Sequence, residues 1–142
     1  MLNTKVRERL QKDDPSRDDG DARERIWTIV SNAMQAGKLD DEFVIDAIKA
    51  DDRQRVTLSL VALGRVPEAV IERVLKSGSA QLITSLAWHC NLGMRTAFEL
   101  QKSIAKVAHS DLLPARNGVD FPLSPQQMTS QLELMGIEHK GA

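Results

Sequence analysis

The only adjacent residues whose types could do chemistry together are His89 and Cys90. A thiolate beside an imidazole can bind a metal ion or act as a nucleophile with its base. On a helix, however, neighbouring side chains point about 100° apart, so these two cannot easily share one metal ion or one proton. The other histidines, His109 and His139, lie far away in sequence, in regions that we do not expect to converge. The pattern therefore predicts a buried cysteine beside a histidine at a helix end, and no metal site.

The sequence contains none of the short motifs that mark well-known enzyme classes. There is no Gly-rich phosphate loop followed by Lys and Ser or Thr, no G-x-G-x-x-G after a strand, no H-E-x-x-H and no G-x-S-x-G elbow. The single cysteine excludes an internal disulfide and a zinc site built from several cysteines. We therefore expect no catalytic residue, no cofactor and no enzymatic activity.

The two tryptophans are candidates for partner binding, because exposed Trp is enriched at binding hot spots. Trp88 belongs to a predicted helix at 79–91, where it either packs against the following helix or is exposed. Trp27 belongs to an apolar stripe at helical spacing, which favours a core anchor over a binding surface.

Four basic residues, Arg65, Arg73, Arg95 and Lys102, could contact a partner or a nucleic acid if they converge on one side. Glu99 lies between the last two at helical spacing, so this face is expected to carry a ladder of salt bridges rather than a basic groove. The net charge of −1 gives no global bias toward nucleic acid or an anionic membrane.

Most of these candidate residues lie in or next to a stretch of the sequence that repeats itself. Val44–Ile48 is followed 26 positions later by Val70–Val74, and Ser59-Leu60 matches Ser85-Leu86 at the same offset. Each copy is predicted to form an amphipathic helix, a turn and a helix that is apolar nearly all round, and a helix of that second kind is buried between neighbours. The sequence therefore predicts an all-α protein of about six to seven helices without a sheet, a right-handed α-solenoid of helical hairpins with units at 41–66 and 67–92.

Further helices are predicted on both sides of the repeats. One spans 21–36 with Asp21 as its N-cap, and another spans 93–108. The last begins at Ser124-Pro125, where Gln127 completes a capping box, and it is expected to pack back on the domain. Residues 1–20 are expected to form a charged arm or linker, 21–137 the helical-repeat domain and 138–142 a frayed tail.

Composition favours one globular domain in the cytoplasm. Apolar residues make up 42% of the 142 residues, enough for an aliphatic core in a helical domain of this size. No apolar run approaches the roughly 18–20 residues of a membrane span, and the charged N-terminus has no apolar signal-peptide segment. We therefore expect a cytoplasmic protein without a membrane partner.

The repeat over Leu39–Leu92, the helix after it and the segment Asp120–Met128 resemble the DUF2336 family. That is a bacterial family of unknown function with HEAT-like helical repeats. The likeness covers residues 39–137 and corresponds to the C-terminal portion of such proteins. The resemblance implies a HEAT-like solenoid, and it transfers no catalytic residue.

These patterns together predict a non-enzymatic helical-repeat scaffold or adaptor that binds another protein. The alternative is a nucleic-acid-binding helical-repeat domain, which the mixed charge makes the less favoured of the two. A homodimer is a further alternative, in which Met128, Leu132 and Met135 pack onto a second copy instead of folding back.

Overall fold

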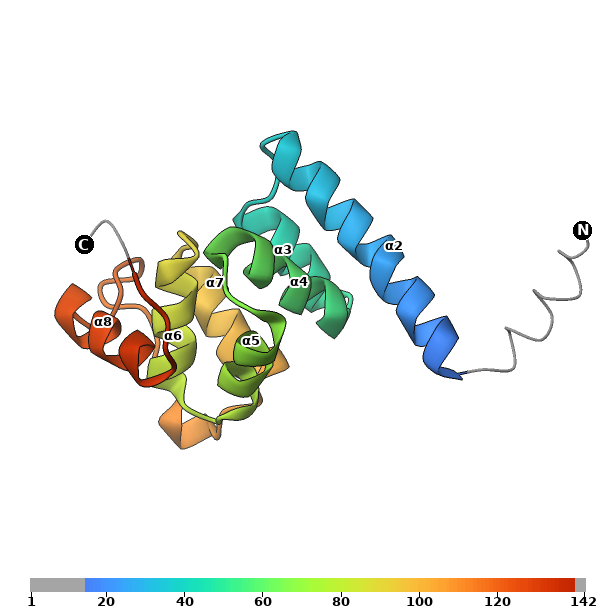
Figure 1. Ribbon diagram of the computed structural model, residues 1–142. Coiled ribbons are helices and arrows are strands. Elements are labelled where there is room, and N and C mark those ends of the chain that lie inside the picture. Colours follow the sequence, from blue (N-terminus) through green and yellow to red (C-terminus); the bar gives the residue numbers. More distant parts are fainter. Residues whose placement is uncertain (1–14, 140–142) are drawn as a thin grey trace, which may run out of the picture.

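Helices make up most of the molecule (Figure 1). The computed structural model describes residues 15–139, with side chains from residue 21 onward. Within that range there are seven α-helices and no strand, apart from an isolated bridge between Arg116 and Asp120. None of these helices is long and apolar enough to cross a membrane. The all-α prediction is confirmed, whereas the solenoid stacking and its handedness stay predictions.

The elements are α2 (Pro15–Gln35), α3 (Asp41–Lys49), α4 (Arg53–Gly64), α5 (Glu68–Lys76), α6 (Ala80–His89), α7 (Met94–Glu99), the π-helical η1 (Leu100–Ile104), the 3-10 turn η2 (His109–Asp111) and α8 (Pro125–Leu134).

The repeated stretch folds into two helical hairpins, α3–α4 and α5–α6. Asp40, Asp52 and Ser79 each cap a helix through a side-chain oxygen that accepts a backbone N–H. Ser59 and Ser85 also match, because both are fully buried and both donate the hydroxyl to the carbonyl four residues earlier at 2.7 Å. The two matching serines therefore make the same local contact in both hairpins.

The helix α4 separates two hydrophobic clusters, which explains why it is apolar nearly all round. Val56 and Leu60 face the main core, whereas Leu58 packs with Val30 of α2 in a smaller cluster. All four side chains are fully buried. The prediction that this helix lies between neighbours is confirmed.

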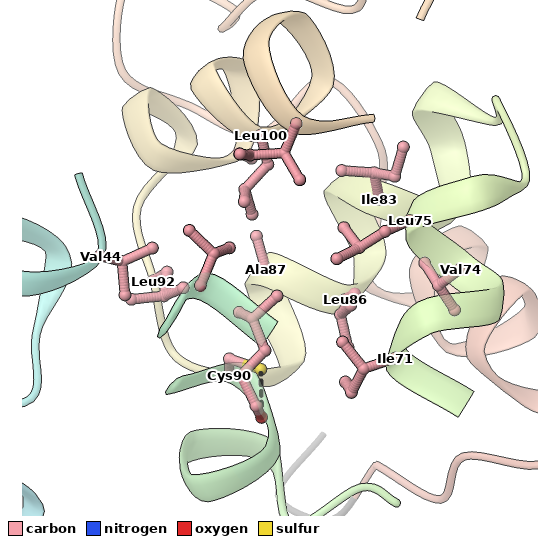
Figure 2. Packing of buried hydrophobic residues seen from close by; sticks show 14 of the residues in the cluster. Val44, Ile71, Val74, Leu75, Ile83, Leu86, Ala87, Cys90, Leu92 and Leu100 are labelled. Carbon is pink, nitrogen blue, oxygen red and sulfur yellow. Dashed lines mark hydrogen bonds between the residues drawn. The ribbon is translucent and has the colours of Figure 1, made fainter. Parts of the chain in front are cut away.

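The main core is assembled from helices of both hairpins and closed by α7 and η1. Figure 2 shows Val44 of α3, Ile71 of α5, Leu86 of α6 and Leu100 of η1 converging in it. The burial of each such side chain contributes about 1.5–3 kcal/mol. Because α7 contacts both α3 and α6, it joins the first hairpin to the second.

A residue from another helix caps the start of α7. Its N-cap position is Gly93, which has no side chain to offer. Instead the Oδ2 atom of Asp41 in α3 accepts the Gly93 N–H at 2.7 Å and the Thr96 hydroxyl at 2.5 Å. This carboxylate therefore links the first predicted repeat to the helix that follows the second.

The buried Gln101 of η1 holds the loop that follows. Its amide nitrogen donates to Thr84 Oγ1 and to the Leu113 carbonyl at 3.0 Å each, and its amide oxygen accepts the Leu113 N–H at 2.7 Å. The helical segment ends at Ile104, not at residue 108 as predicted. The Leu113 backbone thus forms hydrogen bonds with a buried side chain, in place of the backbone hydrogen bonds that a longer helix would provide.

The helices α2 and α8 lie at opposite ends of the molecule (Figure 1). The capping box of Ser124 and Gln127 is present, and α8 packs on α6 with Met128 and Leu132 buried, so the predicted packing of this helix on its own domain is confirmed.

The helix α2 packs on α4 and begins at Pro15. The predictions that 15–20 belong to a linker and that Asp21 is an N-cap are therefore wrong, since Pro suits a first turn and one internal Gly costs only about 1 kcal/mol. Residues 1–14 of the predicted arm lie outside the described residues.

Candidate functional site

Trp88, His89 and His139 form one cluster at the end of α6. The first two are the last residues of that helix, and His139 follows the turn after α8. Gly136 makes this turn with a φ of 76°, a left-handed conformation that glycine adopts without strain. The next residue, Ile137, is buried in the core. Because α8 packs on α6, this turn returns the chain to the end of α6.

His139 contacts both of the α6 residues. Its ring is stacked on Trp88 with 4.1 Å between the centroids and 30° between the planes. Its Nδ1 atom lies 2.8 Å from Nδ1 of His89, whose Nε2 lies 2.9 Å from the Gly64 carbonyl oxygen. A carbonyl only accepts, so Nε2 of His89 carries the proton, and its Nδ1 accepts from Nδ1–H of His139. This hydrogen-bond network assigns one tautomer to each neutral ring.

The cluster corrects two predictions and answers an open question. His139 does converge with His89, although 50 positions separate them, and it is packed rather than part of a frayed tail. Trp88 does not lie exposed, because it is half-buried, packs against the main core and carries the ring of His139 stacked on it. No local pattern in the sequence could reveal this contact, since it depends on α8 packing against α6.

The surroundings of His139 disfavour its charged form. Burial lowers the pKa of His139 below its ordinary value of 6.5, and the neighbouring His89 lowers it further. A charged imidazole loses part of its hydration at this position, and a positive charge on His89 would repel it. His139 is therefore uncharged in this cluster at neutral pH.

An open cavity of about 660 Å³ lies beside the two histidines. That volume falls within the roughly 300–1,000 Å³ of small-molecule pockets. Arg65 and Glu138 line it together with His89 and His139, and its apolar walls come from Leu63, Val66, Pro67, Val70 and Ile137. The turn after α4 forms one wall of this cavity, and the segment after α8 forms another.

Gly64 at the end of α4 packs closely against Cys90 and His89. A Cβ atom on Gly64 would lie 2.9 Å from Cys90 Sγ and 3.1 Å from His89 Cδ2, so this position suits glycine. Cys90 is buried as predicted, and burial raises the pKa of its thiol to about 12. A thiol that stays protonated is neither a nucleophile nor a metal ligand. Across residues 15–139, no three His, Cys, Asp or Glu side chains are placed to hold a metal ion.

Trp27 lies on the outer side of α2, where 38% of it is exposed. The prediction that it anchors the core is therefore wrong, and Ile26, Val30 and Ala33 make the contacts with the smaller cluster instead. Met34, two turns after Trp27 on the same side, is 41% exposed. The apolar stripe of α2 is wider than the surface that α4 covers, so its edges face solvent.

The four candidate basic residues lie on four different elements. Arg65 is in the turn after α4, Arg73 is exposed on α5, Arg95 is on α7 and Lys102 is on η1. Lys102 pairs with Glu99 at 3.6 Å as the predicted ladder requires. Arg95 instead pairs with Glu42 of α3 at 3.6 Å. Two of the four charges are thus balanced by a carboxylate, and the four do not form one continuous stripe along a helix.

The comparison with protein families finds one match over most of the chain. The family described as "Uncharacterised protein conserved in bacteria (DUF2336)" matches residues 2–122. The match begins earlier than the resemblance at 39–137 and ends before the capping box of α8. No curated protein and no solved structure matches the chain. With a match that extends from before α2 through η2, the chain belongs to the DUF2336 family.

Proposed function

We propose that this chain is a non-enzymatic protein-binding module, and that its interaction surface is the outer side of α2 around Trp27 and Met34. The exposure of Trp27 carries this proposal. Five large hydrophobic side chains are exposed in the described part of the chain, and three of them, Trp27, Ile29 and Met34, are on α2. Trp is the residue type most enriched at binding hot spots, and a desolvated Trp can dominate the energy of an interface.

The spacing on this surface suits a helix of the partner. Trp27 and Met34 are seven residues apart, so they project from the same side two turns apart, which matches the anchors of a helix laid against another helix. Arg23, one turn before Trp27, pairs with Glu68 of α5, so this side of α2 also carries a contact with the second hairpin. We therefore expect a partner that presents an amphipathic helix with apolar residues at the matching spacing.

Two observations support protein binding over the other functions considered. The one thiol is buried with a raised pKa, which does not suit a nucleophile. Arg95 and Lys102 are paired with carboxylates, and paired charges are poorly suited to neutralise phosphates. Turnover of a substrate by the purified protein would refute the non-enzymatic part of the proposal.

The test compares the two edges of the same helix. Trp27→Ser and Met34→Ser alter the proposed surface, and Ile29→Ser is the control, because Ile29 is 49% exposed on the other edge of α2. Each variant is used as bait in the source cell, and the recovered protein is then purified and titrated against the parent chain. Trp27 emission should shift to shorter wavelength on binding, since the ring leaves water.

The expected result is one protein that binds the parent and the Ile29→Ser chain alike. Its affinity for Trp27→Ser should fall about 30-fold or more, which corresponds to a hot spot of at least 2 kcal/mol. Equal binding by Trp27→Ser would show that α2 is not the interface. Loss of binding only after nuclease treatment would favour nucleic acid, and self-association lost in Trp27→Ser would make the partner a second copy of the chain.

A further inference from the structure

We propose that His89 and His139 form a pH-sensitive latch, which holds the segment Gly136–His139 over Trp88 near neutral pH and releases its end in mild acid. This inference is independent of the α2 surface. It stands on the hydrogen bond between the two rings, the stack of His139 on Trp88 and the open cavity beside them. The cavity gives the released end room to move, while the buried Ile137 keeps the segment before it anchored.

The geometry of the rings is that of a hydrogen bond and not of a metal site. The ring centroids are 5.1 Å apart, and the two Nδ1 atoms are 2.8 Å apart. The centroid distance exceeds the Nδ1–Nδ1 distance by about the sum of the two ring radii. The two nitrogen atoms therefore lie on the line between the ring centres and face each other. Nitrogen ligands of one metal ion must instead point to a common third position. One shared proton therefore joins His89 to His139.

Added protons weaken the contact between His89 and His139. The neutral pair carries a proton on Nε2 of His89 and one on Nδ1 of His139, as the Gly64 carbonyl requires. A first added proton can go to Nε2 of His139 and leave the bond between the rings in place. A second must go to Nδ1 of His89, where it removes the acceptor and sets two N–H groups and two charges against each other. The closed latch therefore binds at most one added proton, whereas the open one binds two.

The other charges around the pair do not reverse this effect. Arg65 of the α4–α5 turn and Glu138 of the latch segment line the same cavity with opposite signs, and both are exposed to screening solvent. The thiol of Cys90, the residue after α6, is neutral and buried. Because the closed latch binds fewer protons than the open one, the ratio of open to closed latch rises as the pH falls below 6.5, the ordinary pKa of His139.

The experiment follows Trp88 as the only tryptophan. In a Trp27→Phe chain, acrylamide quenching of Trp88 is measured from pH 8 to pH 4.5, alongside far-UV circular dichroism. We expect low quenching near pH 8 and a rise that begins below about pH 6.5, with unchanged helical content. His139→Ala should be highly quenched at every pH. The control His109→Gln changes the exposed histidine of η2 and should keep the parent profile.

Three results would overturn the latch. Quenching that stays constant over this range in the Trp27→Phe chain would show that the contact does not respond to protons. A His139→Ala chain with the parent profile would assign the response to another group. Loss of helical content at the same pH as the rise in quenching would mean that the whole fold, and not the segment after α8, responds to acid.

Discussion

Replacing Asp41 by Ala tests whether one carboxylate joins the start of the repeat to the helix that follows it. Asp41 is in α3, yet it accepts the backbone N–H of Gly93 at 2.7 Å and the hydroxyl of Thr96 at 2.5 Å in α7. Thr96 is fully buried, so its hydroxyl has no water to replace the lost partner. In the Ala variant both donors lose their acceptor, and the cap of α7 is lost.

The expected loss follows from these two bonds. A helix cap contributes about 0.5–2 kcal/mol, and a hydrogen bond to a charged group about 1.5–3 kcal/mol. We expect Asp41→Ala to lower the free energy of unfolding by about 2–4 kcal/mol. Two matched controls belong to the same region: Asp40→Ala removes only the cap of α3 and should cost about 1 kcal/mol, and Glu42→Gln removes only an exposed ion pair and should cost less than about 1 kcal/mol.

Urea unfolding followed by circular dichroism measures these differences, and a double-mutant cycle with Thr96→Val isolates the bond between the side chains. The coupling between Asp41 and Thr96 should be about 1–3 kcal/mol. A loss for Asp41→Ala no greater than that for Asp40→Ala, or a coupling near zero, would refute the link between α3 and α7.

Three further predictions concern buried groups near the site and the loop. The raised pKa of Cys90, about 12, keeps the native thiol neutral while the unfolded thiol ionises above about pH 8.5, so stability falls as pH rises past that value. In urea unfolding from pH 8 to pH 11, the free energy of unfolding of the parent minus that of Cys90→Ala should therefore fall by up to about 1.4 kcal/mol per pH unit above that value, and a constant difference would contradict this. Gln101→Leu should cost about 2 kcal/mol or more, because the Leu113 N–H loses its acceptor, and hydrogen exchange at that amide should accelerate; unchanged exchange would mean that the loop is held by other contacts. Gly64→Ala should cost about 1–3 kcal/mol through crowding against Cys90 Sγ, with the loss reduced in a Gly64→Ala/Cys90→Ala chain; thermal unfolding that shows a gain in stability for Gly64→Ala alone would mean that the clash relaxes.

Local patterns predicted the elements that depend on neighbours in sequence. Ser124 caps a helix, and Gln127 completes its capping box, as their types and spacing predicted. The apolar circumference of α4 correctly predicted burial between neighbours, because such a helix has no polar side to give to water. The start of α2 was wrong by six residues, since charge and Pro were taken as signs of a linker where they are compatible with a first helical turn.

The candidate site was predicted only in part. Trp88 and Trp27 were named as binding candidates, but the sequence assigned Trp27 to the core, and nothing in it paired Trp88 with His139. The stripe of apolar residues predicts which side of α2 faces the rest of the protein. How much of that stripe is buried depends on α4, the helix that packs against it. His139, the partner of His89 that the sequence did not predict, lies 50 positions later and after α8, so only the packing of helices brings the two together.

Residues within a few turns of one another are enough to predict the all-α class, the two helical hairpins, the capping box of α8 and the burial of Cys90. Tertiary packing alone sets which surfaces are left uncovered and which distant groups meet: the exposed edge of α2, the Asp41 cap of α7 and the pairing of His89 with His139. Contacts across 50 or more positions depend on how whole helices pack, and that packing follows from the summed shape of many apolar side chains rather than from any local pattern.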